Sequence, residues 1–314
     1  MGGKKQEKKS FRSKIAAVKR YLPLYFMMLP AMAYLLINNY LPMSGLVLAF
    51  KKYRARDGIW GSEWVGFKNF SFLLKNKELP ILFRNTIGYN ICFIIVNMVL
   101  GVILAILITE IRNQKFRKFA QSSILFPFVV SIIIVSYMVR GFLDPEAGLM
   151  NHILEAMGRD PVSWYDVSKY WPGILIFVNT WKSVGYGCIL YISAILGIDA
   201  SLFESASLDG ANKFQKIWYI TLPFLKPTVI TVALLSIGKI FNSDFGLFYQ
   251  VPQGSGLITN VTQTVDTFVY KALTTHSDIG MSAAASFFQS VIGFLLVMIF
   301  NAITNKISKE NALF

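Results

Sequence analysis

The sequence predicts an all-α polytopic membrane protein with six transmembrane helices. Hydrophobic residues make up 54% of the chain and charged residues only 15%, whereas charged residues approach about a quarter of an ordinary soluble domain. The mean hydropathy is +0.50. A helix that crosses the hydrocarbon layer needs roughly 20 mostly apolar residues, because lipid cannot satisfy unpaired backbone groups. Six stretches of the sequence meet this length.

The six expected spans are separated by polar loops, and proline or asparagine interrupts some of them. They lie at 21–50, 84–109, 120–142, 171–198, 225–249 and 280–304. The first contains Pro30, Asn38, Asn39 and Pro42, so one span followed by an exposed segment is an alternative there. We expect three regions: a basic arm at 1–20, a membrane domain at 21–304 that includes a polar loop at 199–223, and a tail at 305–314.

The distribution of basic residues predicts the orientation. The arm at 1–20 carries eight Lys or Arg residues, and the short loop at 110–119 carries four. Short loops and the first helix weigh most in the positive-inside rule, so we expect both termini to be cytoplasmic. The net charge of +14 then indicates attraction to anionic membrane lipid. It does not indicate nucleic-acid binding, because no soluble basic domain is present.

The loop at 199–223 contains ESASLDGANKFQKIWYITLP, a polar stretch between two apolar runs. Ser201 and Glu204 have the spacing of a capping box, which predicts a short helix that ends near Asp209. Gly210 can adopt the left-handed conformation that terminates a helix. Asn212 can cap a second helix, which Pro223 is expected to stop before the fifth span.

These residues resemble the EAA loop of permease subunits in bacterial binding-protein-dependent ABC importers, EAA-x3-G-x9-I-x-LP. The loop lies between the fourth and fifth of six spans, as it does in that family, and Ser205 replaces the first alanine of the motif. The likeness covers nearly the whole chain, and three C-terminal segments are similar to the sugar-importing branch. The residues that the resemblance assigns to coupling with the ATPase are Glu204, Ala206, Asp209, Gly210, Ile220, Leu222 and Pro223.

The resemblance implies the architecture of a type I ABC importer in the bacterial plasma membrane. Its implied partners are two cytoplasmic ATPase subunits, an extracytoplasmic sugar-binding lipoprotein and a second permease, a homologue being favoured over an identical copy. ATP and magnesium would bind to the ATPases. The chain lacks G-x4-G-K-[ST], since Gly238-Lys239 has Ala233 and Ile240 at the other motif positions. We expect no catalytic residue, no metal site and no bound cofactor in this chain.

Charged and aromatic residues within the spans are candidates for a translocation pathway, because charges inside a membrane are costly and aromatic rings can stack on sugars. Arg140 is a further charged residue and lies nearer the outer end of the third expected span. Pairing within the bundle, snorkelling and the interfacial aromatic belt are the alternative roles. Lys239 and Asp244 are expected on one helix, close enough to pair. The candidates are Tyr137, Trp181, Lys182, Tyr186, Lys239, Asp244, Phe248 and Tyr249.

Three other functions fit the composition less well. A membrane-embedded glycosyl- or lipid-transferase would require clustered carboxylates or a His/Asp constellation, whereas the acidic residues of the loop at 143–170 are scattered. A secondary transporter or channel would show an inverted repeat, and we find no convincing one. A permease of the same family for a solute other than a sugar remains an alternative.

Overall fold

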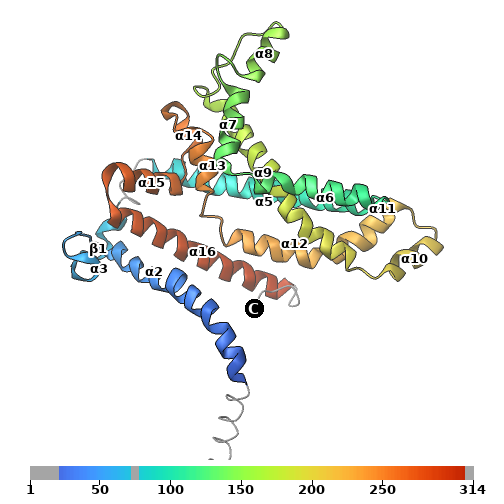
Figure 1. Cartoon of the computed structure of the whole chain (residues 1–314), viewed down its shortest axis with the longest axis horizontal. Helices are drawn as coiled ribbons and strands as arrows, with labels where there is room; N and C mark the ends of the chain where they lie inside the picture. Colours follow the sequence, from blue (N-terminus) through green and yellow to red (C-terminus); the bar gives the residue numbers. More distant parts are fainter. Residues whose placement is uncertain (1–20, 72–77, 308–314) are drawn as a thin grey trace, which may run out of the picture. The chain divides into compact units, whose positions relative to one another are not determined.

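The computed structural model describes residues 21–71 and 78–307 (Figure 1). They belong to two compact units, one that ends at Asn69 and one that begins at Phe70. The arm predicted at 1–20 and the residues 308–314 of the predicted tail lie outside the described residues.

The first unit consists of a long apolar helix and a small hairpin. The helix runs from Tyr21 to Phe50 and is not broken at its asparagines, because a π-turn precedes Pro42 and the amide of Leu41 bonds to the carbonyl of Leu36. A π-turn accommodates the proline, which has no N–H to donate. The later elements are η1 (Leu36–Tyr40), α2 (Leu41–Met43), η2 (Ser44–Phe50), β1 (Lys51–Lys52), α3 (Gly58–Gly61), β2 (Glu63–Trp64) and η3 (Gly66–Ser71), with β1 and β2 antiparallel.

The second unit is built from long helices joined by short ones. Its elements are α5 (Leu79–Thr109), α6 (Gln114–Val129), α7 (Ile132–Leu143), α8 (Leu149–Ala156), η4 (Ser168–Tyr170), α9 (Trp171–Leu196), α10 (Ala200–Leu208), α11 (Lys213–Lys216), η5 (Ile217–Thr221), α12 (Leu222–Ile237), α13 (Phe245–Gln250), η6 (Gly256–Ile258), α14 (Thr259–Thr262), α15 (Val265–His276) and α16 (Ile279–Ile307). Over the described residues, five helices are long and apolar enough to cross a membrane, and the number is six when the bent pair α6/α7 is counted as one span.

The third span, expected at 120–142, is sharply bent. The helix breaks between α6 and α7, which meet at 93°. Pro127 lies in the last turn of α6, Val130 is extended, and the Ser131 hydroxyl caps α7 by accepting from the Ile133 amide. Serine at this position favours a new helix start over continuation, so α6 and α7 point in different directions.

The residue limits expected for the fifth span, 225–249, are wrong. One helix runs from Lys213 to Ile237, and α13 is a separate element that begins at Phe245. At Gly238 the chain passes close to α16, since a Cβ on Gly293 would lie 2.8 Å from the Gly238 carbonyl oxygen. α12 ends at Ile237 and is followed by turns over 238–241 and irregular backbone over 242–244.

The core of the second unit lies where α5 packs along α9. Around Tyr89, Trp171 and Phe248 one buried cluster forms, and a second surrounds Ala105, Cys188, Tyr191 and Leu225. The two helices lie side by side in Figure 1. Residues beside the breaks at α6/α7 and α12/α13 pack against these two clusters.

Candidate coupling loop and solute pathway

The polar loop forms two short helices, as expected, but its first cap differs from the prediction. The carboxylate of Asp199 accepts from the Ser201 amide at 2.9 Å and begins α10 at Ala200. Ser201 and Glu204 therefore lie inside the helix, and the predicted capping box at Ser201 is wrong. Asp199 precedes Ser201 and competes for the same role, and a carboxylate also complements the positive helix N-terminus.

The turn between the two helices agrees with the sequence prediction. Gly210 has a φ of +78°, which L side chains rarely adopt. Asn212 begins α11, and its side chain forms a reciprocal capping box with Gln215. The Lys216 ammonium donates to the Ser207 hydroxyl at 2.6 Å, which ties α11 to α10.

Pro223 does not stop the second helix, contrary to the expectation. The chain stays helical from α11 through the π-turn η5 into α12, and the amide of Leu222 bonds to the carbonyl of Ile217. The wider turn accommodates the proline without a break. As a result α11 is a direct extension of the span α12, and a displacement of the loop would move that span.

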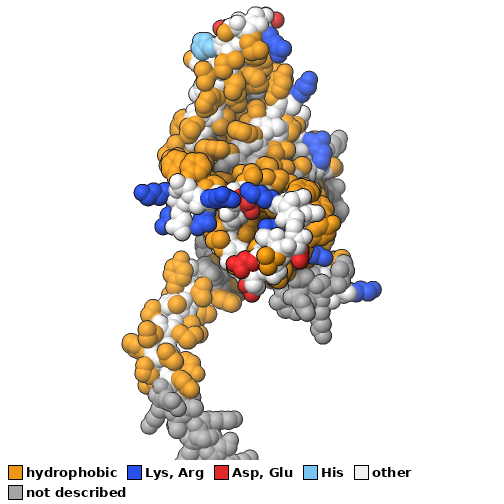
Figure 2. All heavy atoms as spheres, turned by 90° about the vertical axis from the view of Figure 1, so that its right-hand side faces the viewer, with side chains coloured by type: hydrophobic (Ala, Val, Ile, Leu, Met, Phe, Trp, Pro, Cys, Tyr) orange, Lys and Arg blue, Asp and Glu red, His pale blue; other side chains and the backbone are white. Residues whose placement is uncertain are grey.

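The loop exposes an unusual mixture of side chains at one end of the second unit. Leu208 is 90% exposed, and Phe214, Trp218 and Tyr219 are also exposed. Figure 2 looks onto this end and shows acidic and basic side chains close together there. The ammonium of Lys213 lies 3.5 Å from the Glu110 carboxylate at the end of α5. The ion pair is exposed and worth about 0–1 kcal/mol, but it connects the loop to a second span.

A hollow of about 290 Å³ follows the inner side of this loop. Four residues of the predicted coupling set line it: Ala206, Asp209, Gly210 and Ile220. Glu204 is exposed on α10 and Pro223 on α12, whereas Leu222 is half-buried. Most of the motif therefore lies around the Gly210 turn between α10 and α11, a segment that we call the elbow (residues 200–216).

Lys182 lies at the break between α6 and α7. Its ammonium donates to the carbonyl oxygens of Val130 at 2.5 Å, Phe128 at 3.1 Å and Pro127 at 3.4 Å. These carbonyls are at the end of α6, where the regular helical partners are missing, although the Pro127 carbonyl also accepts from the Val130 amide. Lys182 therefore satisfies the helix end, and the positive charge complements the negative end of the helix dipole.

Two neighbours of Lys182 on α9 take different positions. Tyr186 is more than half exposed and stacks on Phe128 at 4.8 Å between ring centroids. Trp181 is half-buried and packs against the core cluster around Trp171. The three candidates on α9 are thus at the crossing of α9 with the α6/α7 break.

The non-helical backbone after α12 is held by polar side chains from neighbouring helices. Asn90 of α5 donates to the carbonyls of Ile240 and Asn242 at 2.9 and 3.1 Å. Gln289 of α16 donates to the Phe241 carbonyl at 2.6 Å, and the Asp266 carboxylate accepts from Ser243. Irregular backbone is tolerated at membrane depth where protein supplies its hydrogen bonds.

The prediction that Lys239 and Asp244 share one helix and pair is wrong. Lys239 is exposed in the turn after α12, and Asp244 caps α13 by accepting from the Leu247 amide at 3.1 Å. Because the break lies between them, their five-residue separation no longer puts them on one face. The described residues show no ion pair between these two side chains.

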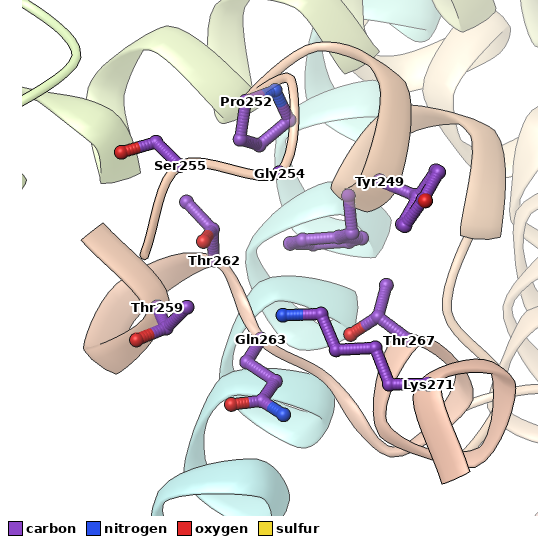
Figure 3. A pocket seen from close by; sticks show the side chains of 10 residues that line it. Tyr249, Pro252, Gly254, Ser255, Thr259, Thr262, Gln263, Thr267 and Lys271 are labelled. Carbon is purple, nitrogen blue, oxygen red and sulfur yellow. The ribbon is translucent and has the colours of Figure 1, made fainter. Parts of the chain in front are cut away.

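The aromatic candidates on α13 and α7 take different positions. Phe248 is buried against Tyr89, whereas Tyr249 is half-buried and lines two hollows. Together with Tyr137 it lines one of about 280 Å³. Figure 3 shows a smaller pocket beside Tyr249, into which the Lys271 ammonium points. That pocket holds about 20 Å³, enough for a water molecule but not for a sugar.

Some functional residues were not singled out from the sequence. Asn90 and Gln289 hold the broken backbone, and Gln253 contacts Arg140 across the hollow. The signal that was available for Asn90 and Gln289 is a polar amide inside an otherwise apolar span. Gln253 offers no such signal, because it lies in a loop.

Comparison with known proteins agrees with this geometry. Residues 97–309 match the family described as binding-protein-dependent transport system inner membrane component. Protein LplB of Bacillus subtilis is 32% identical over 94% of this chain and 92% of its own length. The polygalacturonan/rhamnogalacturonan transport system permease protein YteP of the same species is 31% identical over 98% and 94%.

Solved structures give the same result. A chain of a bacterial ABC transporter involved in the import of the acidic polysaccharide alginate is 28% identical, with a TM-score of 0.84 over 94% of this chain and 99% of that chain. The alginate transporter has also been solved in complex with an alginate pentasaccharide-bound periplasmic protein. This chain therefore belongs to the family of binding-protein-dependent transport system inner membrane components, which are membrane subunits of ABC importers rather than enzymes.

Proposed function

We propose that this chain is a permease subunit that forms the translocation pathway of an oligosaccharide importer. The observation that carries the proposal is the elbow at Gly210, which is exposed and continues as helix into α12. Two ATPases would bind this elbow and a homologous elbow on a second permease. A lipid-anchored sugar-binding protein would deliver the solute at the opposite side. Both termini would be cytoplasmic.

The elbow can transmit force because it is short, braced and joined to two spans. Movement of α10 reaches α11 through the Lys216–Ser207 hydrogen bond and the Gly210 turn. From α11 it reaches α12 through continuous helix, and α5 through the Lys213–Glu110 contact. A rigid element that responds to ATP-driven closure of its partners is what alternating access requires.

The exposed apolar residues of the elbow favour a protein partner. Leu208, which is 90% exposed, lies two residues before Gly210, and Glu204 offers a charge for a basic residue of the ATPase. The oligosaccharide assignment rests on the names of the relatives and on the sugar-branch similarity of the C-terminal segments. The half-buried tyrosine at 249 fits it, because amphipathic rings suit sugar faces.

The test is association of the complete importer in detergent after Gly210→Val, with Gly158→Val as the matched control. Both glycines have a positive φ, +78° and +72°, and both have open space around the position of a Cβ. The substitution therefore strains both backbones alike. We expect Gly210→Val to lose co-purification with the ATPase and Gly158→Val to retain it. Retained association and retained transport in both variants would contradict the proposal.

A further inference from the structure

A hollow of about 280 Å³ lies between α7 and the turn that follows α13. Its polar lining consists of Ser136, Tyr137, Arg140, Tyr249, Gln250 and Gln253. Among the residues that line it in the described part of the chain, Arg140 alone carries a charge. The volume is near the lower limit of about 300 Å³ for ligand pockets, which suits one sugar residue of a longer chain.

Arg140 is held in place by a residue far away in the sequence. Its Nη1 donates to Oε1 of Gln253 at 2.6 Å. Gln253 has a φ of +52°, an uncommon conformation for a residue other than glycine, and such strain concentrates at ligand sites. The turn after α13 therefore fixes the Gln253 side chain, and Gln253 in turn fixes Arg140.

The guanidinium keeps donors for a ligand. A guanidinium has five N–H groups in a planar fork, and the hydrogen bond to Gln253 uses one of them. The Asp144 carboxylate forms an exposed ion pair with Nε at 3.7 Å, a distance too long for a good hydrogen bond, so the pair uses none of the five N–H groups closely. Asp144 is instead occupied by the amides of Glu146 and Ala147, at 3.1 and 3.0 Å. The Arg140 side chain is 55% exposed, so water and solutes reach it.

Aromatic rings complete the site. Tyr137 is 67% exposed on α7, one turn before Arg140. Tyr249 is stacked on Phe245 at 4.9 Å between ring centroids and meets the edge of Tyr270 at 5.0 Å. The ring of Tyr249 is therefore fixed before a ligand arrives, which lowers the entropic cost of binding.

We propose that this hollow binds a carboxylated sugar, a uronate residue of the transported oligosaccharide, with Arg140 on the carboxylate. The tyrosines supply apolar faces for the ring, and Gln250 supplies a donor and an acceptor for hydroxyls. A second hollow of about 240 Å³, which Arg140 and Gln253 also line, has the Asp144 carboxylate in its own lining, and this carboxylate would repel an anion placed there. The proposal rests on the oligosaccharide function given above.

The experiment uses the complete importer in proteoliposomes and two glycans of equal length. One is an oligogalacturonate, and the other is the same glycan with its carboxyl groups reduced to alcohols. The central variant is Gln253→Glu, which keeps an acceptor for Arg140 and adds a carboxylate that neutralises it. Arg140→Gln removes the charge directly. Arg159→Gln is the control, because Arg159 is an exposed arginine that follows α8 and lines none of the hollows described.

We expect the apparent KM of wild type for the acidic glycan to be lower than for the reduced one. Gln253→Glu and Arg140→Gln should each raise the KM for the acidic glycan about tenfold, a change typical of losing a hydrogen bond to a charged group. The KM for the reduced glycan should stay within about twofold. Arg159→Gln should match wild type. A defect in docking of the binding protein would affect both glycans equally.

The outcomes separate this inference from the function on which it rests. Equal effects of Gln253→Glu on both glycans, or no effect on either, would overturn the uronate site and leave an oligosaccharide importer. A wild type that prefers the reduced glycan would overturn it too. Transport of neither glycan by the wild type would overturn the uronate site alone, because the oligosaccharide function is tested separately by the Gly210→Val variant.

Discussion

The ammonium of Lys182 lies 2.5 Å from the carbonyl oxygen of Val130, at the break where α6 turns into α7. It also reaches the carbonyls of Phe128 and Pro127. One side chain of α9 thus terminates a neighbouring helix. A lysine inside a span is commonly assigned to a solute pathway, and here its contacts stabilise a helix end.

Replacement of Lys182 by methionine is expected to destabilise the fold. The change keeps the length of the side chain but leaves three carbonyls without this donor, at a cost of about 1–3 kcal/mol. Thermal unfolding of the purified chain in detergent measures the loss. Lys239→Met is the control, because Lys239 is exposed in the turn after α12. Equal stability of the two variants would show that the contacts of Lys182 contribute nothing.

Gly185 is expected to be intolerant of even one added methyl group. A Cβ there would lie 1.9 Å from the Ile124 carbonyl oxygen, where α9 crosses α6. The backbone is the obstacle, so the helices must separate, and the expected cost is about 1–3 kcal/mol or more. Gly187→Ala is the matched control, since it has open space and alanine favours helix. The yield and thermal stability of Gly185→Ala should fall, and those of Gly187→Ala should not.

Gln289 is expected to hold the irregular backbone after α12. It is 5% exposed, and its Nε2 donates to the Phe241 carbonyl at 2.6 Å. Leucine of similar size would leave this carbonyl unpaired, with an expected loss of about 1–3 kcal/mol. Ser290→Ala tests the next position, where the hydroxyl only bonds within its own helix. Thermal unfolding of both variants is the measurement, and an unchanged Gln289→Leu variant would disprove the role.

The Asp199 cap predicts a dependence of α10 on pH. The amide and side chain of Ser201 donate to this carboxylate and hold the pKa of Asp199 below its usual value of 3.8. Because the folded pKa is lower than the unfolded one, the cap stabilises α10 fully above the unfolded pKa. The stabilisation is lost as the pH falls through the folded pKa.

Hydrogen exchange of the first amides of α10, corrected for the intrinsic rate, checks this dependence. Protection should be constant from about pH 7 to 5 and decline below about pH 4. Asp199→Asn keeps an acceptor without a titrating charge, so its protection should not change with pH. Asp199→Ala should lower protection at every pH. Identical profiles for all three proteins would exclude the cap.

The membrane class, the apolar spans and the turn at Gly210 could be predicted from the amino-acid sequence. These depend on local signals: runs of apolar residues long enough to cross a bilayer, the left-handed conformation at Gly210, and the cap at Asn212. Each acts within a few residues of its position, so it can be recognised without knowledge of the fold. Two predictions from local signals were wrong. Asp199, not Ser201, caps α10, and Pro223 does not end the helix, because a π-turn accommodates it.

Tertiary structure decided the breaks in the third and fifth spans and the site around Arg140. Lys182 is 52 residues from the Val130 carbonyl that it satisfies, and Arg140 is 113 residues from Gln253. At each break the irregular backbone is held by a side chain from a distant part of the chain: Lys182 bonds to the Val130 carbonyl, and Asn90 bonds to the Ile240 carbonyl. Such partners come together through the packing of α5, α7, α9 and α16, and no pattern of neighbouring residues encodes them.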